Sequence, residues 1–287
     1  MQIKSSATQP IILPLKNIET GEPFNIMYKN DDLRKDQLII ALINIINNIL
    51  IDAQIDAPIV RYAVRPISCD SGFIELVPNS FTLNYIKEVQ KSTILNFIMN
   101  NNPNLTVISI REKFLKSCSV YSIICYVFGI SDRHLDNIMI SSDASTSSLF
   151  NIDYSYILNR DPVKFTSVKM RVSTDMVEAF GNKNYEQFKT LCNQIYNAIR
   201  PYINLFINFL MILSVTHKEE FTEEHVYNEL ISRMCPGENN KQAIVQISAV
   251  IESCNSDYEY QLIDYFHSKS KIISKKTLMD SIYGIFK

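Results

Sequence analysis

Apolar and polar residues alternate over short segments in the first eighty positions of the chain. Turn residues such as Thr20 and Gly21 separate these segments, and this pattern predicts strands of an antiparallel sheet. The predicted strands cover residues 10–15, 22–29, 59–68 and 72–77. Residues 31–50 are apolar on almost every face, which predicts a buried helix that Asp31 or Asp32 caps.

Beyond residue 80, apolar residues recur at helical spacing. The predicted helices cover residues 109–128, 173–180, 185–213, 222–234, 241–253 and about 275–286. Residues 147–158 instead predict a short strand that leads into a loop, and residues 141–148 (SSDASTSS) predict a hairpin turn. The chain as a whole predicts an α+β fold of two lobes: a small sheet-and-helix lobe at 1–79 and a larger, mainly helical lobe at 80–287.

Charge and cysteine content narrow the class of protein. The 28 basic and 30 acidic residues nearly cancel, and no face combines aromatic with basic residues, so a nucleic-acid binder is disfavoured. None of the six cysteines forms a C-x-x-C pair, and four lie in apolar segments. This distribution indicates free thiols in a reducing compartment rather than disulfides or a zinc site.

The sequence shows no signal peptide at its N-terminus. Its most apolar run, residues 203–215, is interrupted by Asn204 and Asn208 and is shorter than the roughly 18–20 residues of a membrane span. We therefore expect a soluble intracellular protein that acts on membranes, if at all, from their surface.

Residues 132–137 (DRHLDN) place many proton-transferring and metal-binding groups between two apolar runs. Phosphoryl transfer needs a cation for the phosphates, oxygen ligands for Mg²⁺ and a group that takes the proton of the attacking hydroxyl. Lys29, at the end of a predicted strand, offers the cation. Asn137 and Asp153 offer oxygen ligands, and His134 stands beside Asp132.

Each of these residues also has a structural interpretation. A lysine at a strand end is usually solvated, an aspartate after a strand often forms a turn, and Asp-Arg-His is compatible with a surface cluster of ion pairs. The complete pattern, D-R-H-x-D-N followed some fifteen residues later by an apolar strand ending in Asp153, favours phosphoryl transfer.

Six stretches together resemble the catalytic domain of phosphatidylinositol 3-kinases, and most closely its class III members. The stretches are IKSSA (3–7), FNIMYKNDDLRKDQLI (24–39), GFIELV (72–77), DRHLDN (132–137), NIDYSYILNRDP (151–162) and KMRVSTDMVEAFGN (169–182). The class III assignment depends on YILNRDP and KMRVSTDMVEAF, because class I enzymes have a different activation loop. The resemblance implies a two-lobed, protein-kinase-like fold that uses ATP with Mg²⁺ or Mn²⁺.

The resemblance also assigns roles by position. The residues implied to bind ATP, through a phosphate-binding loop, a lysine, an inner pocket and an adenine pocket, are Ser5, Ser6, Lys29, Asp36, Tyr62, Ile74, Val77, Met139 and Ile152. His134, with Asp132 beside it, is implied to assist deprotonation of the inositol 3-hydroxyl, and Asn137 and Asp153 to hold the metal. The cations implied to meet the lipid phosphate are Arg160, Lys164, Lys169 and Arg171.

The sequence departs from the family at several positions. It lacks a glycine in KNDDLR, has Ser131 where glycine is usual, Asn151 in place of histidine, and Asp153-Tyr154-Ser155 in place of Asp-Phe-Gly. Since glycine permits backbone angles that other residues disfavour, we expect a stiffer or shifted loop. The reactive groups are all present, which favours an active enzyme over a pseudokinase or a nucleotide-binding interaction module.

The resemblance implies phosphorylation of phosphatidylinositol to phosphatidylinositol 3-phosphate, for endosomal or vacuolar trafficking or autophagy, by a cytoplasmic enzyme peripheral on internal membranes. A related protein Ser/Thr kinase is the chemical alternative, and the residues after His134 argue against it. The sequence begins at the phosphate-binding loop, so retention of the family's regulatory kinase-like and vacuolar-sorting or autophagy subunits stays open. The tail, residues 267–287, combines Lys269, Lys271, Lys275 and Lys276 with an apolar stripe, typical of a membrane-surface helix or of a terminal helix packed on the lobe.

Overall fold

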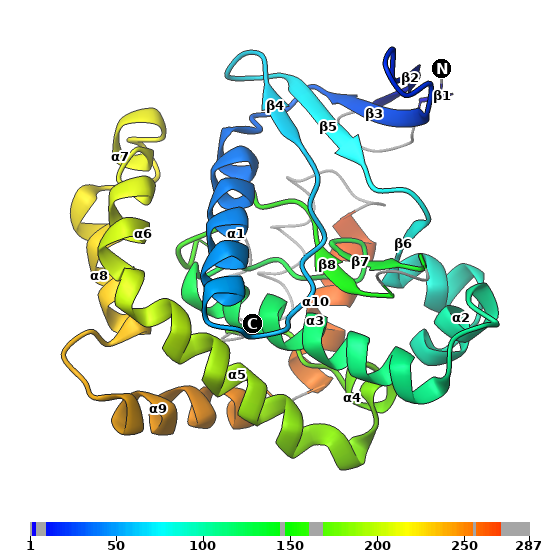
Figure 1. Cartoon of the computed structure of the whole chain (residues 1–287). Helices are drawn as coiled ribbons and strands as arrows, with labels where there is room; N and C mark the ends of the chain where they lie inside the picture. Colours follow the sequence, from blue (N-terminus) through cyan, green and yellow to red (C-terminus); the bar gives the residue numbers. More distant parts are fainter. Residues whose placement is uncertain (1, 4–9, 144–146, 161–168, 255–256, 271–287) are drawn as a thin grey trace, which may run out of the picture.

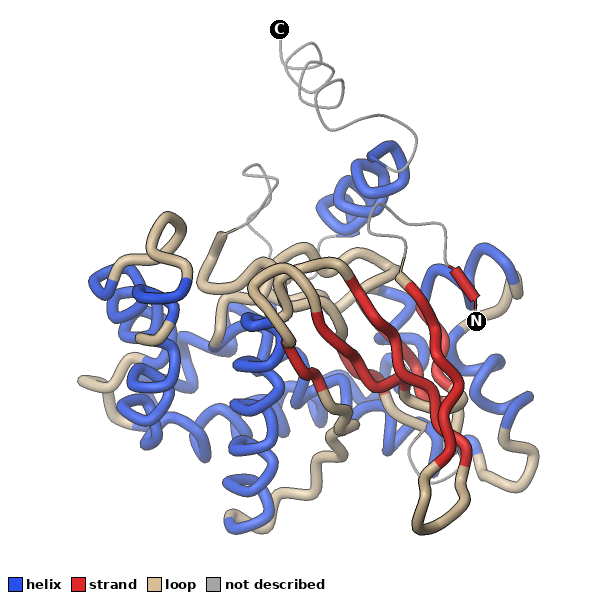
Figure 2. Tube along the Cα trace, turned by 90° about the horizontal axis from the view of Figure 1, so that it is seen from above, coloured by secondary structure: helices blue, strands red, loops and turns tan. Residues whose placement is uncertain are grey.

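The computed structural model describes residues 2–3, 10–143, 147–160, 169–254 and 257–270. It confirms the predicted order, an antiparallel sheet followed by a mainly helical part (Figure 1). The larger sheet has the strand order β1-β2-β3-β5-β4. Its strands are β1 (Gln2–Ile3), β2 (Ile11–Lys16), β3 (Pro23–Lys29), β4 (Val64–Pro66) and β5 (Gly72–Leu76). Neighbouring strands are all antiparallel, and seen from above they run side by side with helices on either side of them (Figure 2).

The strand predicted at 59–68 is much shorter in the structure, because only Val64–Pro66 pairs with β5. The carbonyl of Ala63 still accepts the N–H of Glu75 on β5 at 2.8 Å, but the residues before it contact the later part of the chain. The carbonyl of Val60 accepts a hydrogen bond from the hydroxyl of Tyr121 at 3.1 Å. The hydroxyl of Tyr62 donates in turn to the carbonyl of Asn151 at 3.3 Å. This segment therefore ties the two parts of the chain together.

The predicted buried helix is α1 (Arg34–Asp52), which starts three residues later than expected. Asp32 is the reason, because its carboxylate accepts the backbone N–H of Arg34 at 3.0 Å and also binds the guanidinium of that residue. The helix stands between β4 and α6 (Figure 1) and contacts α5 as well. Its apolar side chains are accordingly buried on more than one face.

A second, three-stranded antiparallel sheet supports the DRHLDN segment (132–137). Its strands, in spatial order, are β6 (Ser80–Thr82), β7 (Ile138–Ser141) and β8 (Leu149–Asn151). The pairing of β7 with β8 agrees with the hairpin turn and the short strand predicted at 141–158. A lobe boundary at residue 79 stays a prediction, although β6 begins at the next residue and pairs with β7.

The remaining elements are helices and helical turns. They are a π-helical turn (Tyr85–Val89), α2 (Ile94–Asn101), α3 (Val107–Val127), α4 (Thr174–Phe180), a 3₁₀ turn (Asn182–Asn184), α5 (Tyr185–Ile199), a 3₁₀ turn (Arg200–Tyr202), α6 (Ile203–Leu210), α7 (Leu213–Thr216), α8 (Glu223–Met234), α9 (Asn240–Ser253) and α10 (Asp257–Ser270). Helix α3 forms the centre, and every residue from Ser117 to Val127 on it is buried. The helix predicted at 275–286 lies outside the described residues.

The prediction of one continuous helix at 185–213 was wrong. Pro201 has no backbone N–H to donate, and here the chain tightens into the 3₁₀ turn before α6 begins. By length and composition alone the helical run Asn182–Thr216 could cross a membrane. In the structure, however, α5 packs against α3 and α9, as the core helix of a globular protein does.

Two phenylalanines on α6 offer a matched test of this packing. Phe206 is fully buried and meets Phe128 edge-on at 5.4 Å between ring centroids, whereas Phe209 is 39% exposed. We expect Phe206→Ala to lower the free energy of unfolding by about 3–5 kcal/mol, because it removes a core ring and leaves a cavity. Phe209→Ala should cost about 1 kcal/mol or less. Urea unfolding followed by circular dichroism measures both, and equal losses would contradict the packing described.

Candidate active site

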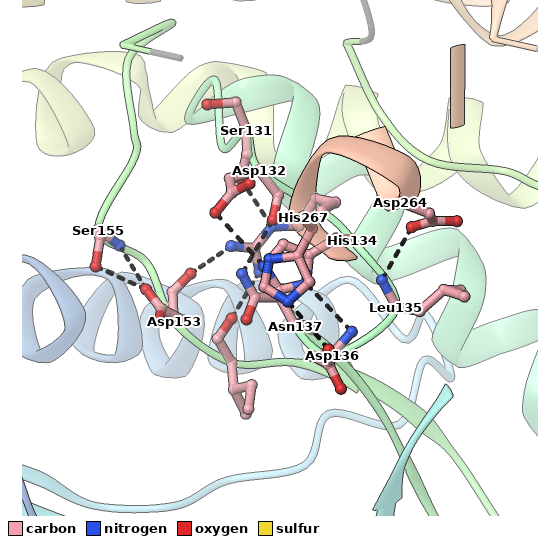
Figure 3. A network of polar contacts seen from close by, with 12 residues as sticks. Ser131, Asp132, His134, Leu135, Asp136, Asn137, Asp153, Ser155, Asp264 and His267 are labelled. Carbon is pink, nitrogen blue, oxygen red and sulfur yellow. Dashed lines mark hydrogen bonds and ion pairs between the residues drawn. The ribbon is translucent and has the colours of Figure 1, made fainter. Parts of the chain in front are cut away.

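The loop between α3 and β7 carries the DRHLDN segment (Figure 3). It turns at Gly129, which has a φ of +54°. A Cβ at this position would lie 2.8 Å from the backbone nitrogen of Asn159, so both the backbone angle and the close approach favour glycine. The loop ends where β7 begins, and Asn137 is therefore fixed at the start of the central strand of the smaller sheet.

Arg133 holds the loop to the segment that follows β8. Its buried guanidinium donates hydrogen bonds to the carbonyls of Ser131 at 2.9 Å, Ile152 at 2.7 Å and Asp153. Sequence reasoning gave Arg133 no role. The signal available was its place between Asp132 and His134, in a loop that lies between two apolar runs. An arginine buried in such a loop must find several hydrogen-bond acceptors. Arg133 is thus a positioning residue that sets the expected metal ligand against the expected base.

The structure brings Lys29 and Asp153 together from the two sheets. The ammonium of Lys29 lies 2.6 Å from a carboxylate oxygen of Asp31 and 3.7 Å from one of Asp153. Burial acts to lower the pKa of Lys29, but Asp153 and Asp31 outweigh it and raise the pKa above its ordinary value. Burial acts to raise the pKa of Asp153, but Lys29 and the Ser155 hydroxyl outweigh it and lower that pKa. Both groups are therefore charged at neutral pH.

Asn137 and Asp153 remain the expected metal ligands. The two residues are joined through the backbone, because the N–H of Ile152 donates to the carbonyl of Asn137 at 3.1 Å. The amide nitrogen of Asn137 donates to the carbonyl of Asp132 at 3.0 Å, which orients that side chain. One carboxylate and one amide oxygen are hard donors of the kind Mg²⁺ takes in proteins. The donor set fits the metal, although the role of each residue stays a prediction.

Asp36 and Tyr62 lie buried behind Asp153. The carboxylate of Asp36 accepts the N–H of Tyr154 at 2.9 Å. Burial, with the charge of Asp153 adding to it, raises the pKa of Asp36 to about 7. This carboxyl group is therefore partly protonated near neutral pH, unlike Asp153.

The raised pKa of Asp36 predicts a pH effect on stability. A carboxyl group that holds its proton more tightly in the folded state contributes stability below its unfolded value of 3.8, and this contribution is lost as pH rises through about 7. We therefore expect Asp36→Asn to become progressively more stable than wild type between these two values. Melting temperatures of both chains from pH 4.5 to 8 give the difference in stability at each pH. Contributions from groups present in both chains, His134 among them, cancel in that difference. A constant difference would contradict the raised pKa.

His134 is buried and faces several polar groups. Its Nδ1 accepts the backbone N–H of Asp136 at 3.2 Å, and its Nε2 lies 3.7 Å from a carboxylate oxygen of Asp132. Its ring stacks on that of His267, with 3.4 Å between centroids and 21° between planes. Burial, with His267 and Arg133 adding to it, lowers the pKa of His134 to about 3. The imidazole is therefore neutral at pH 7 and in the form that accepts a proton.

The four residues expected around adenine come from both sheets. Ile74 lies on β5 and Val77 directly follows it, while Met139 lies on β7 and Ile152 directly follows β8. All four are partly buried against the core, and their role toward adenine stays a prediction. The expected phosphate-binding serines, Ser5 and Ser6, lie outside the described residues.

The four expected lipid-binding cations are not equivalent in the structure. Arg171 differs from the expectation, because it is buried and its guanidinium forms a bidentate ion pair with Asp264 on α10 at 2.7 and 2.8 Å. Its charge is thus already neutralised inside the protein. Lys169 and Arg160 are exposed, as a headgroup contact would require. Lys164 lies outside the described residues.

The lost glycines leave no left-handed strain at the positions where serine stands. Positive φ angles occur at Asp132 (57°) and Asp153 (61°), and not at Ser131 or Ser155. Aspartate tolerates this region better than most residues do. The Ser155 hydroxyl donates to the carboxylate of Asp153 at 2.6 Å, and Tyr154, fully buried, donates its hydroxyl to the carbonyl of Asn151 at 2.9 Å. The expected distortion is therefore not needed to accommodate these substitutions.

Known proteins match most of the chain in sequence. The family model described as "Phosphatidylinositol 3- and 4-kinase" matches residues 23–96 and 86–218. The chain is 31% identical over 277 residues to "Phosphatidylinositol 3-kinase pik3" of Schizosaccharomyces pombe, covering 92% of this chain and 34% of that protein. It is 32% identical over 221 residues to "Phosphatidylinositol 3-kinase, root isoform" of Glycine max, covering 74% and 26%. It is 31% identical over 219 residues to "Phosphatidylinositol 3-kinase VPS34" of Arabidopsis thaliana, covering 73% and 26%. The chain thus matches about a third or less of the length of these relatives.

Proposed function

Because the chain belongs to the phosphatidylinositol 3- and 4-kinase family, we propose that it is a lipid kinase that transfers the γ-phosphate of ATP to the 3-hydroxyl of phosphatidylinositol. The observation that carries the proposal is the meeting of Lys29 from the sheet with Asp153 from the helical part, 3.7 Å apart. The DRHLDN loop lies beside them, held by Arg133. The relatives named phosphatidylinositol 3-kinases support the choice of substrate.

In the proposed reaction the 3-oxygen forms a bond to the γ-phosphorus while the bond from that phosphorus to the bridging oxygen breaks, and ADP leaves. A bound divalent ion supplies charge neutralisation for the phosphates. Lys29 binds phosphate oxygens through its ammonium. His134 accepts the proton of the 3-hydroxyl through an imidazole that is neutral at pH 7. The negative charge of the bound triphosphate raises the basicity of that imidazole.

The proposal extends to place and partners. Lys169 and Arg160 are exposed cations in the stretch that the resemblance assigns to the activation loop, and they suit an anionic headgroup at a membrane surface. We place the enzyme on the cytoplasmic face of endosomal or other internal membranes, in trafficking or autophagy, with vacuolar-sorting or regulatory kinase-like subunits as its partners. The relatives named phosphatidylinositol 3-kinases support a membrane lipid as the substrate, and the compartment and partners rest on the resemblance in sequence.

A second candidate is a nucleotide-binding module without turnover. The low pKa of His134 favours it, because a base that holds its proton so weakly accepts one poorly.

The test is a kinase assay with the purified chain, phosphatidylinositol vesicles, ATP and either Mg²⁺ or Mn²⁺. We expect a product whose new phosphate chromatographs at the 3-position. ATP binding by calorimetry without any product, with either metal, would replace the proposal by the nucleotide-binding module. Phosphorylation of protein substrates but not of lipid would replace it by a protein Ser/Thr kinase.

A further inference from the structure

A single buried ion pair binds two backbone groups, one on each side of His134. The guanidinium of Arg171 forms a bidentate pair with Asp264 on α10 and also donates to the carbonyl of Arg133 at 3.0 Å. The carboxylate of Asp264 accepts the N–H of Leu135 at 3.2 Å (Figure 3). The DRHLDN loop is therefore held by two side chains that come from much later in the chain.

These two contacts fix the backbone at His134. The carbonyl of Arg133 belongs to the planar peptide unit before His134, and the N–H of Leu135 belongs to the unit after it. The φ and ψ angles of His134 are the only soft backbone angles between the two units. Holding both planes thus fixes both angles, and with them the direction in which the imidazole leaves the backbone.

The ion pair is itself well supported. The side chain of Arg171 is 4% exposed, and a bidentate pair between a guanidinium and a carboxylate combines strength with a defined geometry. Tyr260, one turn before Asp264 on α10, accepts the N–H of Val172 through its hydroxyl at 3.0 Å. The guanidinium of Arg171 also lies 5.1 Å from the centre of the Tyr260 ring. Helix α10 therefore holds the 171–172 stretch at two points and the loop at a third.

We propose that the Arg171–Asp264 pair positions His134 for proton transfer, so that both are positioning residues of the reaction. The inference rests on the proposed function, in which His134 accepts the proton of the lipid hydroxyl. Such a transfer needs the two heavy atoms within about 2.6–3.2 Å of each other. A misplacement of about 1 Å can cost on the order of 100-fold in rate. Arg171 and Asp264 touch neither ATP nor lipid and act through the loop backbone.

Two conservative variants weaken the pair. Asp264→Asn leaves one oxygen to accept what the carboxylate accepts, so either Leu135 or Arg171 loses an acceptor. Arg171→Lys keeps the charge but not the planar fork that reaches Asp264 and the carbonyl of Arg133 together.

Glu229→Gln is the matched control. The side chain of Glu229 is 21% exposed, against 24% for Asp264, and it likewise pairs with a buried arginine, Arg233. Arg233 donates to the carbonyl of Tyr126 on α3 instead of to the 132–137 loop.

We expect kcat on phosphatidylinositol vesicles to fall about 10–100-fold in Asp264→Asn and Arg171→Lys, with KM for ATP unchanged. Glu229→Gln should stay within twofold of wild type. The decisive measurement adds Asp264→Asn to His134→Gln. If the pair acts through His134, the second change lowers kcat no further, because residues that act as a unit are not additive. The full loss in that background, or a wild-type kcat in both single variants, would overturn the proposal.

A second measurement needs no activity. The chain has four histidines, so selective ¹³C,¹⁵N-histidine labelling gives four backbone signals, which His→Gln variants assign. The His134 signal should move in Asp264→Asn and Arg171→Lys and stay in place in Glu229→Gln. An unmoved His134 signal in the first two variants would overturn the proposal, and if only one of them folds, that one decides. A moved signal in a chain that makes no lipid product would keep the pair as the holder of His134 and remove the proposed function.

Discussion

Asp153→Asn should abolish lipid phosphorylation, with a fall in kcat on the order of 10³-fold or more. The amide is similar in size but cannot neutralise a divalent ion, and it removes the charge that faces Lys29 at 3.7 Å. ATP itself should still bind through the remaining contacts, so the loss falls on turnover. Initial rates on phosphatidylinositol vesicles at saturating ATP measure it.

The control for this variant is a measurement of its folding stability. Asp153 accepts hydrogen bonds from the N–H and hydroxyl of Ser155, and an asparagine oxygen can still accept both, although more weakly than a carboxylate. A melting temperature within a few degrees of wild type therefore separates lost chemistry from lost structure. Turnover within tenfold of wild type would remove Asp153 from the metal site.

His134→Gln should lower kcat by about 10²–10⁴-fold while KM for ATP stays nearly unchanged. Glutamine accepts a hydrogen bond but does not take the proton, so the loss is confined to the transfer step. The second measurement is nucleotide affinity by calorimetry, which should match wild type within a factor of about three. A proportional loss of ATP affinity would instead indicate that His134 supports the loop and takes no proton.

The chemistry-bearing residues were predictable because they lie in short, contiguous patterns. The DRHLDN loop lies between α3, which was predicted from its periodicity, and β7, which was visible only as an apolar run. Asp153 follows an apolar strand in the structure as it does in the pattern. Local sequence therefore places these groups at element ends, where loops meet a fixed scaffold.

Contacts between distant segments could not be predicted in this way. Helix α10 was missed, and with it Asp264 and His267, because DYEYQLIDYFHS is polar enough to look like a loop until its partners are known. The resemblance assigned Arg171 to the lipid, and its partner Asp264 on α10 could not be recognised from the sequence. Its nearest carboxylate lies 93 residues away, a separation that no window of sequence reveals.

The effect of the missing glycines on the backbone could not be predicted from the sequence either. Comparing residue types suggests that serine replaces a residue with special backbone angles. The structure shows that the left-handed angles belong to the preceding or following aspartates, Asp132 and Asp153. Residue identity alone does not say which position in a turn has the positive φ, because neighbouring positions exchange that role between turn types.

The carboxylate of Asp264 binds two separate segments at once, the guanidinium of Arg171 and the backbone N–H of Leu135. Since a helix that undocks takes its carboxylate with it, the amide proton of Leu135 becomes exchangeable only while α10 is away from the loop. The rate of deuterium uptake at this one amide therefore measures how often α10, the last described helix, undocks from the loop.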